Sequence, residues 1–131
     1  MVYSRHNHCW RTLYINKIYK ELKALNVMFR VFRAEWYDKK FVKLEKFEQE
    51  RVSKFEQQLK LEPYTGKPLG YRFFREKKFD GKRLLFLVYE EHNIVFLITI
   101  TDKKAQQHEI DLIKAQLDIY KETVDKIAKN L

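Results

Sequence analysis

The sequence contains very little of what secreted or membrane proteins rely on. Among 131 residues there is one cysteine, and no long uncharged apolar run occurs. The lone Cys9 cannot form an internal disulfide, which fits a reducing compartment. A membrane-spanning helix needs about 18 consecutive apolar residues, so we expect no membrane association through a spanning segment. The first 27 residues are basic but lack the continuous apolar stretch of a secretory signal. These absences predict a cytoplasmic protein.

Glycine and proline are also scarce, with three and two residues. Both prolines and two of the glycines fall within residues 63–70, which predicts one main loop there. Hydrophobic residues make up 45% of the chain and aromatics 15%, values typical of a globular protein. The length suits a single domain. The formal net charge of +9 favours an acidic partner: nucleic acid, an acidic protein or an anionic membrane.

Much of this charge lies in residues 67–83, which we call the basic hairpin. It carries seven basic residues against two acids, a net +5. The basic residues are Lys67, Arg72, Arg75, Lys77, Lys78, Lys82 and Arg83. Such crowding on a rigid sheet is tolerable only where solvent or a polyanion screens it, so RNA or DNA phosphates are candidate ligands. The alternative is that these lysines merely discourage edge pairing between sheets.

Periodicity predicts a helix over 10–25, and the main domain covers residues 28–131. Residues 1–27 are then an N-terminal extension, either an added helix or sequence upstream of a misassigned start. The aromatic and β-branched segment 28–36 predicts a strand. Asp38 is a suitable N-cap for two helices over about 38–46 and 48–61, although one bent helix fits nearly as well. Pro63 ends the helical run.

Three strands and a long helix are expected next. The strands cover 71–78, 83–89 and 94–101, with Asp80–Gly81 as a hairpin turn. The second strand, almost purely hydrophobic, should be central. Asp102 then caps a helix over 103–130 with a seven-residue apolar repeat. The fold class is therefore α+β, a twisted antiparallel sheet packed by helices.

Several short segments, taken in order, carry a resemblance to a known family. They are Glu35–Trp36, Lys39–Lys40–Phe41, Gly66–Lys67–Pro68–Leu69, Arg75–Glu76–Lys77, the strand from Lys82 to Tyr89, and Thr101–Asp102–Lys103–Lys104–Ala105. From Met28 to about Gln107 the chain resembles the RelE/ParE superfamily of type II toxins. The order and spacing are most similar to the RelE branch, particularly its archaeal-type members.

The resemblance implies a RelE-like fold, with a strand, a helical hairpin and a three-strand meander. It also implies an endoribonuclease that enters the ribosomal A site and cuts mRNA there. The family's chemistry is metal-free attack of a 2′-hydroxyl on the neighbouring phosphate, so no cofactor is expected. His6, His8 and Cys9 lack a fourth ligand at usable spacing, and no metal site is predicted. The expected protein partner is an acidic antitoxin.

The resemblance further implies which side chains act. Arg83 is the first choice as phosphate clamp, because guanidinium groups brace phosphate at two points. Lys77 is favoured as the base, with Lys78 as alternative, since the hairpin register is open: a two-residue turn pairs Lys78 with Arg83, whereas a longer turn or bulge brings Lys77 or Arg75 beside it. The remaining catalytic candidates are Arg75, Lys104 and His108, and the RNA-binding candidates are Lys67, Arg72, Lys82 and Lys103.

Three departures from the family pattern keep other functions open. The usual late tyrosine is missing, so His108 is the candidate proton donor in its place. The last helix is unusually long, and its apolar repeat could form a homodimer. Residues 1–27 have no counterpart. The alternatives are a ParE-like gyrase inhibitor, disfavoured by the density of basic residues, and a degenerate member that binds RNA or antitoxin without cutting.

Overall fold

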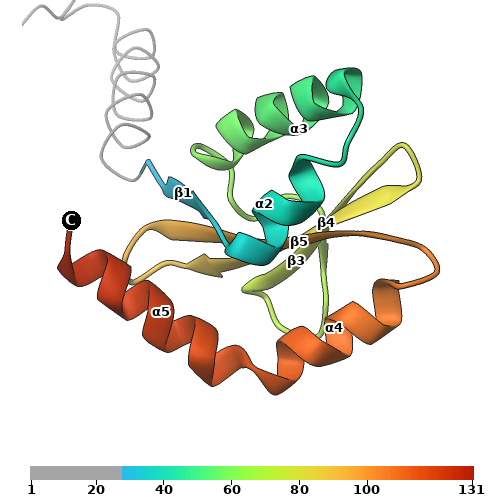
Figure 1. Cartoon of the computed structure of the whole chain (residues 1–131). Coiled ribbons are helices and arrows are strands. Elements are labelled where there is room, and N and C mark those ends of the chain that lie inside the picture. The colour runs from blue at the N-terminus through green and yellow to red at the C-terminus, as the bar shows by residue number, and fades with distance from the viewer. Residues whose placement is uncertain (1–27) are drawn as a thin grey trace, which may run out of the picture.

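The computed structural model describes residues 28–131, which form a five-stranded sheet with two helices against each face (Figure 1). The strands are β1 (Arg30–Arg33), β2 (Lys67–Pro68), β3 (Phe74–Phe79), β4 (Lys82–Tyr89) and β5 (Ile94–Asp102). The helices are α2 (Glu35–Phe41), α3 (Lys46–Leu59), α4 (Gln106–Ala115) and α5 (Leu117–Lys129). This confirms the α+β class. The predicted extension of residues 1–27 lies outside the described residues.

The sheet has the order β1-β5-β4-β3-β2, with the hydrophobic β4 in the centre as expected. Strands β3, β4 and β5 form the predicted antiparallel meander. Strand β1 pairs parallel to β5, so the sheet is mixed rather than antiparallel throughout. The composition of a strand shows that it is buried, but it does not encode the direction of its neighbour.

Strand β4 is hydrophobic without interruption because both of its faces are covered. Leu84, Phe86 and Val88 pack beneath α2 and α3. Leu85 and Leu87 point the other way, into the core beneath α4 and α5. A strand buried on both faces loses the alternation of apolar and polar residues that marks a half-exposed one. The sheet is therefore sandwiched between two helical layers.

The β3–β4 turn fixes the register of the basic hairpin. Asp80 and Gly81 both have positive φ, 44° and 76°, as a two-residue turn of the hairpin type requires. Phe79 consequently pairs with Lys82, and Lys78 with Arg83. The predicted two-residue turn is confirmed.

The first helical boundaries differ from the prediction. Strand β1 ends at Arg33 and α2 begins at Glu35, so the expected strand through residue 36 is too long. Asp38 lies inside α2 rather than at its N-cap. An acid in the first turn also interacts favourably with the helix dipole, so its presence does not mark the boundary. The true cap of the next helix is Glu45, which exchanges hydrogen bonds with Glu48 in a capping box.

The predicted single helix over 103–130 is wrong, because the chain breaks into α4 and α5 at Gln116 (φ −120°, ψ 18°). The break lets both helices follow the twisted sheet, and Ile110, Ile113 and Val124 are buried against it. Much of the apolar repeat therefore packs on the chain's own sheet, and the homodimer stays a prediction. Asp102 accepts a hydrogen bond from Ala105 N at 2.8 Å, just before α4 begins. None of the described helices has the length and apolarity needed to cross a membrane.

Candidate nucleic-acid interface

On the α4 side of the sheet, three polar residues stand side by side on adjacent strands. Lys78 on β3 is paired with Arg83 on β4, which is paired with Thr101 on β5. Neighbouring strands lie about 4.8 Å apart, so these side chains leave the sheet as a row. We call Lys78, Arg83 and Thr101 the α4-side row. It brings together two of the predicted catalytic residues.

Arg83 is held in place by a buried carboxylate. Its Nε lies 3.2 Å from Glu76 Oε1, and the two residues are only 8% and 2% exposed. The same Glu76 oxygen accepts a hydrogen bond from Gln106 at the start of α4, while its Oε2 has no hydrogen-bond partner within residues 28–131. Arg83 Nη1 also donates to Gly81 O at 3.4 Å. A guanidinium has five donor hydrogens, so this fixing leaves donors for a ligand.

A second buried glutamate fastens α4 beside the row. Glu109 accepts hydrogen bonds from Thr99 at 3.1 Å and from Thr101 at 2.6 Å. Its Oε1 also lies 3.1 Å from Lys40 Nζ, which reaches across from α2. This network was not predicted from the sequence. The signal was the Ile-Thr-Ile-Thr pattern of residues 98–101, in which buried hydroxyls need a partner on the helix that covers them.

Arg75 points to the α3 side of the sheet, where it forms hydrogen bonds with the loop that precedes β3. It is 8% exposed and donates to three carbonyl oxygens, those of Thr65 at 2.9 Å, Arg72 at 2.9 Å and Gly66 at 3.2 Å. These bonds tie the 63–72 loop to β3. The structure does not bring Arg75 together with Arg83, and its contacts are those of a structural residue.

Lys77 and Lys82 also face the α3 side. Lys77 Nζ lies 5.5 Å above the centroid of the Phe55 ring. Lys82 Nζ pairs with Glu48 at 2.5 Å, and this hydrogen bond lowers the pKa of Glu48 below its usual range. The hairpin thus divides its cations between two faces. The open question of register is decided for Lys78, because Lys77 points away from Arg83.

The remaining predicted residues lie outside the α4-side row, on other elements of the structure. Lys67 pairs with Glu76 across β2 and β3, which puts it on the same face. Lys103 and Lys104 are exposed in the turn that follows β5, and His108 is exposed in the first turn of α4. Arg72 stands apart, stacked 3.8 Å above the Tyr64 ring. Catalytic and RNA-binding roles for all of these residues stay predictions.

Comparison with known proteins supports this architecture through structure alone. No family model and no curated protein matches the sequence. A mutant of the E. coli toxin RelE in the free state, with two arginines replaced by alanine, superposes with a TM-score of 0.56 at 23% identity, covering 76% of this chain and 98% of that one. The chain has the fold of the RelE toxins. The RelE branch is thereby supported at the level of the fold, and the archaeal type stays a prediction.

Two further RelE structures contain an antitoxin. The RelBE2 toxin–antitoxin complex of Mycobacterium tuberculosis matches with a TM-score of 0.52 and 22% identity, over 58% of this chain and 99% of that chain. The E. coli RelE mutant bound to an antitoxin RelB peptide matches with a TM-score of 0.55 and 21% identity, over 65% and 94%. All three RelE chains are covered almost completely, so the resemblance extends across their whole fold.

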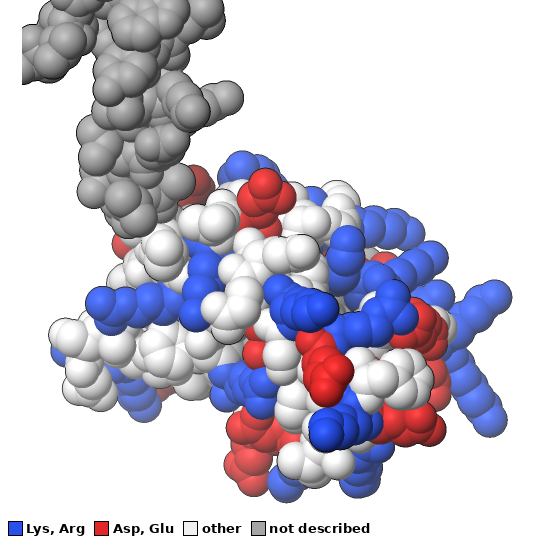
Figure 2. Space-filling view, turned by 90° about the horizontal axis from the view of Figure 1, so that it is seen from above, with Lys and Arg blue, Asp and Glu red and all other residues white. Residues whose placement is uncertain are grey.

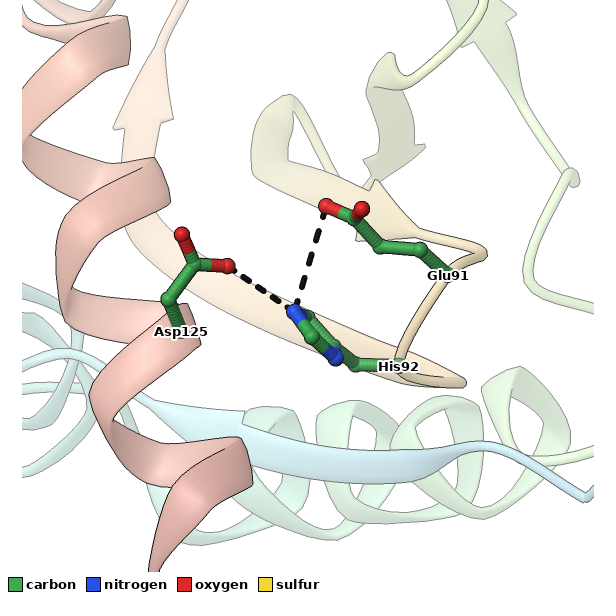
Figure 3. A group of neighbouring side chains, drawn as sticks. All are labelled: Glu91, His92 and Asp125. Atoms are coloured by element: carbon green, nitrogen blue, oxygen red, sulfur yellow. Dashed lines mark hydrogen bonds and ion pairs between the residues drawn. The ribbon is translucent and has the colours of Figure 1, made fainter.

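A cluster of titratable side chains lies at the other end of this RelE-like sheet (Figure 3). His92 Nε2 is 2.8 Å from Asp125 Oδ1 and 3.9 Å from Glu91 Oε1. Lys121 pairs with both carboxylates, at 3.0 and 3.4 Å. The hydrogen bond from His92 is the main cause that lowers the pKa of Asp125. With an ammonium already between the two acids, the cluster is suited to tying α5 to the β4–β5 turn.

Proposed function

We propose that this chain is the toxin of a type II toxin–antitoxin system and cuts mRNA in the ribosomal A site. The observation that carries the proposal is the α4-side row, where Lys78 and Arg83 stand side by side on a RelE fold. Arg83 is fixed by Glu76, so it meets a ligand without further ordering. Preorganised cations of this kind stabilise charge that develops during a reaction.

The reaction is transesterification within the RNA backbone. The 2′-oxygen forms a bond to phosphorus, the bond from phosphorus to the 5′-oxygen breaks, and the 2′ proton passes to a base. Arg83 stabilises the charge on the phosphorane oxygens. Lys78, its neighbour in the row, is the base, in place of Lys77. Lys104 and His108, near the start of α4, are the candidates to protonate the leaving 5′-oxygen.

The proposed partner is an acidic antitoxin, in keeping with the net charge of +9. Two of the matched structures are a toxin–antitoxin complex and a RelE mutant bound to an antitoxin peptide. Toxin and antitoxin would meet in the cytoplasm, where ribosomes and mRNA are found. The proposed homodimer through the C-terminal helices has less support, because the apolar repeat of those helices is used on the sheet.

The test is cleavage of mRNA in a purified translating system, with cut sites read by primer extension. Wild-type protein should cut within the A-site codon, and Arg83→Ala should cut about 100-fold more slowly, the scale of losing one transition-state contact. Arg30→Ala, an exposed arginine on the opposite edge strand β1, is the matched control and should cut at the wild-type rate. Intact mRNA with inhibited DNA supercoiling would transfer the assignment to a gyrase inhibitor.

A second candidate is a chain that binds RNA without cutting it. The observation in its favour is the Glu76–Arg83 pair, which neutralises the guanidinium and leaves Arg83 largely buried. The missing late tyrosine points the same way. RNA binding that depends on the basic hairpin, with no cut sites in translating mRNA, would decide for this candidate.

A further inference from the structure

A basic groove lies on the α3 side of the hairpin, away from Arg83. Its volume is about 450 Å³, and it runs between α3 and β3. Its cationic lining residues are Arg51, Lys54, Lys77 and Lys78, and its aromatic ones are Phe55 and Phe79. We call this the α3-side groove. Figure 2 looks down on this side of the molecule and shows Lys and Arg side chains gathered toward the hairpin end, at the right.

The charge of the α3-side groove is largely uncompensated. No acidic side chain lines it in the described part of the chain. Arg51 pairs with Asp80 at the hairpin tip. Within residues 28–131, neither Lys54 nor Lys77 has a carboxylate oxygen within 4.0 Å. The unpaired charges of Lys54 and Lys77 repel one another, and a bound anion relieves that repulsion.

The floor of the groove is rigid and aromatic. Phe55 is buried and packs edge-on against Phe86 of β4 at 6.1 Å between ring centroids. Lys77 Nζ lies 5.5 Å from the centroid of the Phe55 ring. Exposed Gln58, on the α3 wall, adds an amide that can both donate and accept hydrogen bonds. Cations that follow a backbone, beside aromatic rings, are the arrangement that binds single-stranded nucleic acid.

The groove and the α4-side row meet at one residue. Lys78 projects from the sheet on the side of Arg83, and it is also one of the residues that line the groove. Beyond Glu76 no residue of β2 pairs with β3, so among residues 28–131 no strand neighbours the outer edge of Lys77–Phe79. A flexible single strand of RNA can therefore pass around this edge of the sheet, from the α3 side to the α4 side.

We propose that the α3-side groove binds backbone phosphates of single-stranded RNA and anchors the strand whose scissile bond lies at the α4-side row. This inference rests on the proposed action on RNA. Lys54 and Lys77 contribute affinity here, and neither takes part in the reaction. An acidic peptide could bind the same cations. It would gain little from the path that leads from the groove to Arg83, because it has no phosphate to place there.

The experiment measures RNA affinity apart from cleavage. A uridine oligonucleotide with 2′-O-methyl groups lacks the attacking hydroxyl and stays intact. The double variant Lys54→Ala/Lys77→Ala should bind it on the order of tenfold more weakly, and the plot of log affinity against log salt should become shallower by about 1.4, or about 0.7 per lost phosphate contact. The control Lys126→Ala/Lys129→Ala makes the same charge change in the last turn of α5 and should leave the slope unchanged.

Thermal unfolding of both double variants verifies that they are folded. Unchanged affinity and slope in Lys54→Ala/Lys77→Ala would overturn the inference, as would loss of binding to a glutamate-rich peptide with RNA binding intact. The two proposals fail separately. If the protein cuts mRNA but the double variant leaves the salt dependence of RNA binding unchanged, the proposed function holds and the groove does not bind RNA. If the double variant changes the salt dependence but the wild-type protein does not cut mRNA, the groove binds RNA and the chain is not a nuclease.

Discussion

The two faces of the β3–β4 hairpin carry similar charge but arrange it differently. On the α4 side, Arg83 is buried, paired with Glu76 and fixed in register with Lys78. On the α3 side, Lys54 is exposed and Lys77 is half-buried over an aromatic ring, and both lack a carboxylate partner among the described residues. A fixed guanidinium suits stabilisation of a transition state, because it needs no reorganisation. Free lysines suit salt-dependent attraction of a polyanion. The net charge of a window therefore does not show which of its cations act in chemistry.

The largest expected effect comes from breaking the buried pair on the α4 side. Glu76→Gln leaves Arg83 as an uncompensated buried charge, so we expect a loss of about 3 kcal/mol in the free energy of unfolding. The matched change on the α3 side is Glu48→Gln, whose partner Lys82 is more than a third exposed; it should cost less than about 1 kcal/mol. Urea unfolding at neutral pH measures both. Equal losses would mean that Glu76 does not hold Arg83.

Two neighbouring lysines on β3, Lys77 and Lys78, test the difference between the two faces of the hairpin directly. Lys78→Ala removes a side chain from the row beside Arg83, whereas Lys77→Ala removes one that points to the α3 side. We expect Lys78→Ala to slow mRNA cleavage by about tenfold or more, equivalent to about 1.4 kcal/mol or more in the barrier. Lys77→Ala should leave the rate at saturating ribosomes nearly unchanged. A larger loss of rate from Lys77→Ala would restore Lys77 as the base and contradict the register argument.

Local sequence signals predicted much of this hairpin. Asp80–Gly81 correctly predicted a two-residue turn, since both residues accept positive φ, but the sequence left the register open and favoured Lys77 over Lys78 as the neighbour of Arg83. The hydrophobic run of residues 84–89 likewise predicted a central strand, because only a strand covered on both faces can be apolar throughout. Elements whose structure depends on a few neighbouring residues were predicted well.

Features that depend on distant residues could not be read from the sequence. In the sequence, Glu76 is one of two acidic residues among the seven basic residues of the hairpin. Its role in holding Arg83 is visible only in the structure, where Gln106 and Arg83 both contact its carboxylate. The break at Gln116 has no proline or glycine to announce it, and follows from packing two helices on a twisted sheet. The parallel pairing of β1 with β5 also arises from tertiary structure. The same limit applies to Arg75, whose three carbonyl partners all lie in the preceding loop.

The smallest effect concerns the pH dependence of the α3 side. Lys82 lowers the folded-state pKa of Glu48 below the value of 4.5 for a free glutamate, so the ion pair contributes stability above that pH and loses it as the pH falls through the folded-state pKa. The difference in unfolding free energy between wild type and Glu48→Gln should therefore shrink between about pH 6 and about pH 3. Glu50→Gln, an exposed change on the same helix, should show no such trend. A difference that grows on acidification would mean that the carboxylate is stabilised in the unfolded chain instead, and that Glu48 does not anchor α3 to the hairpin as a charged group.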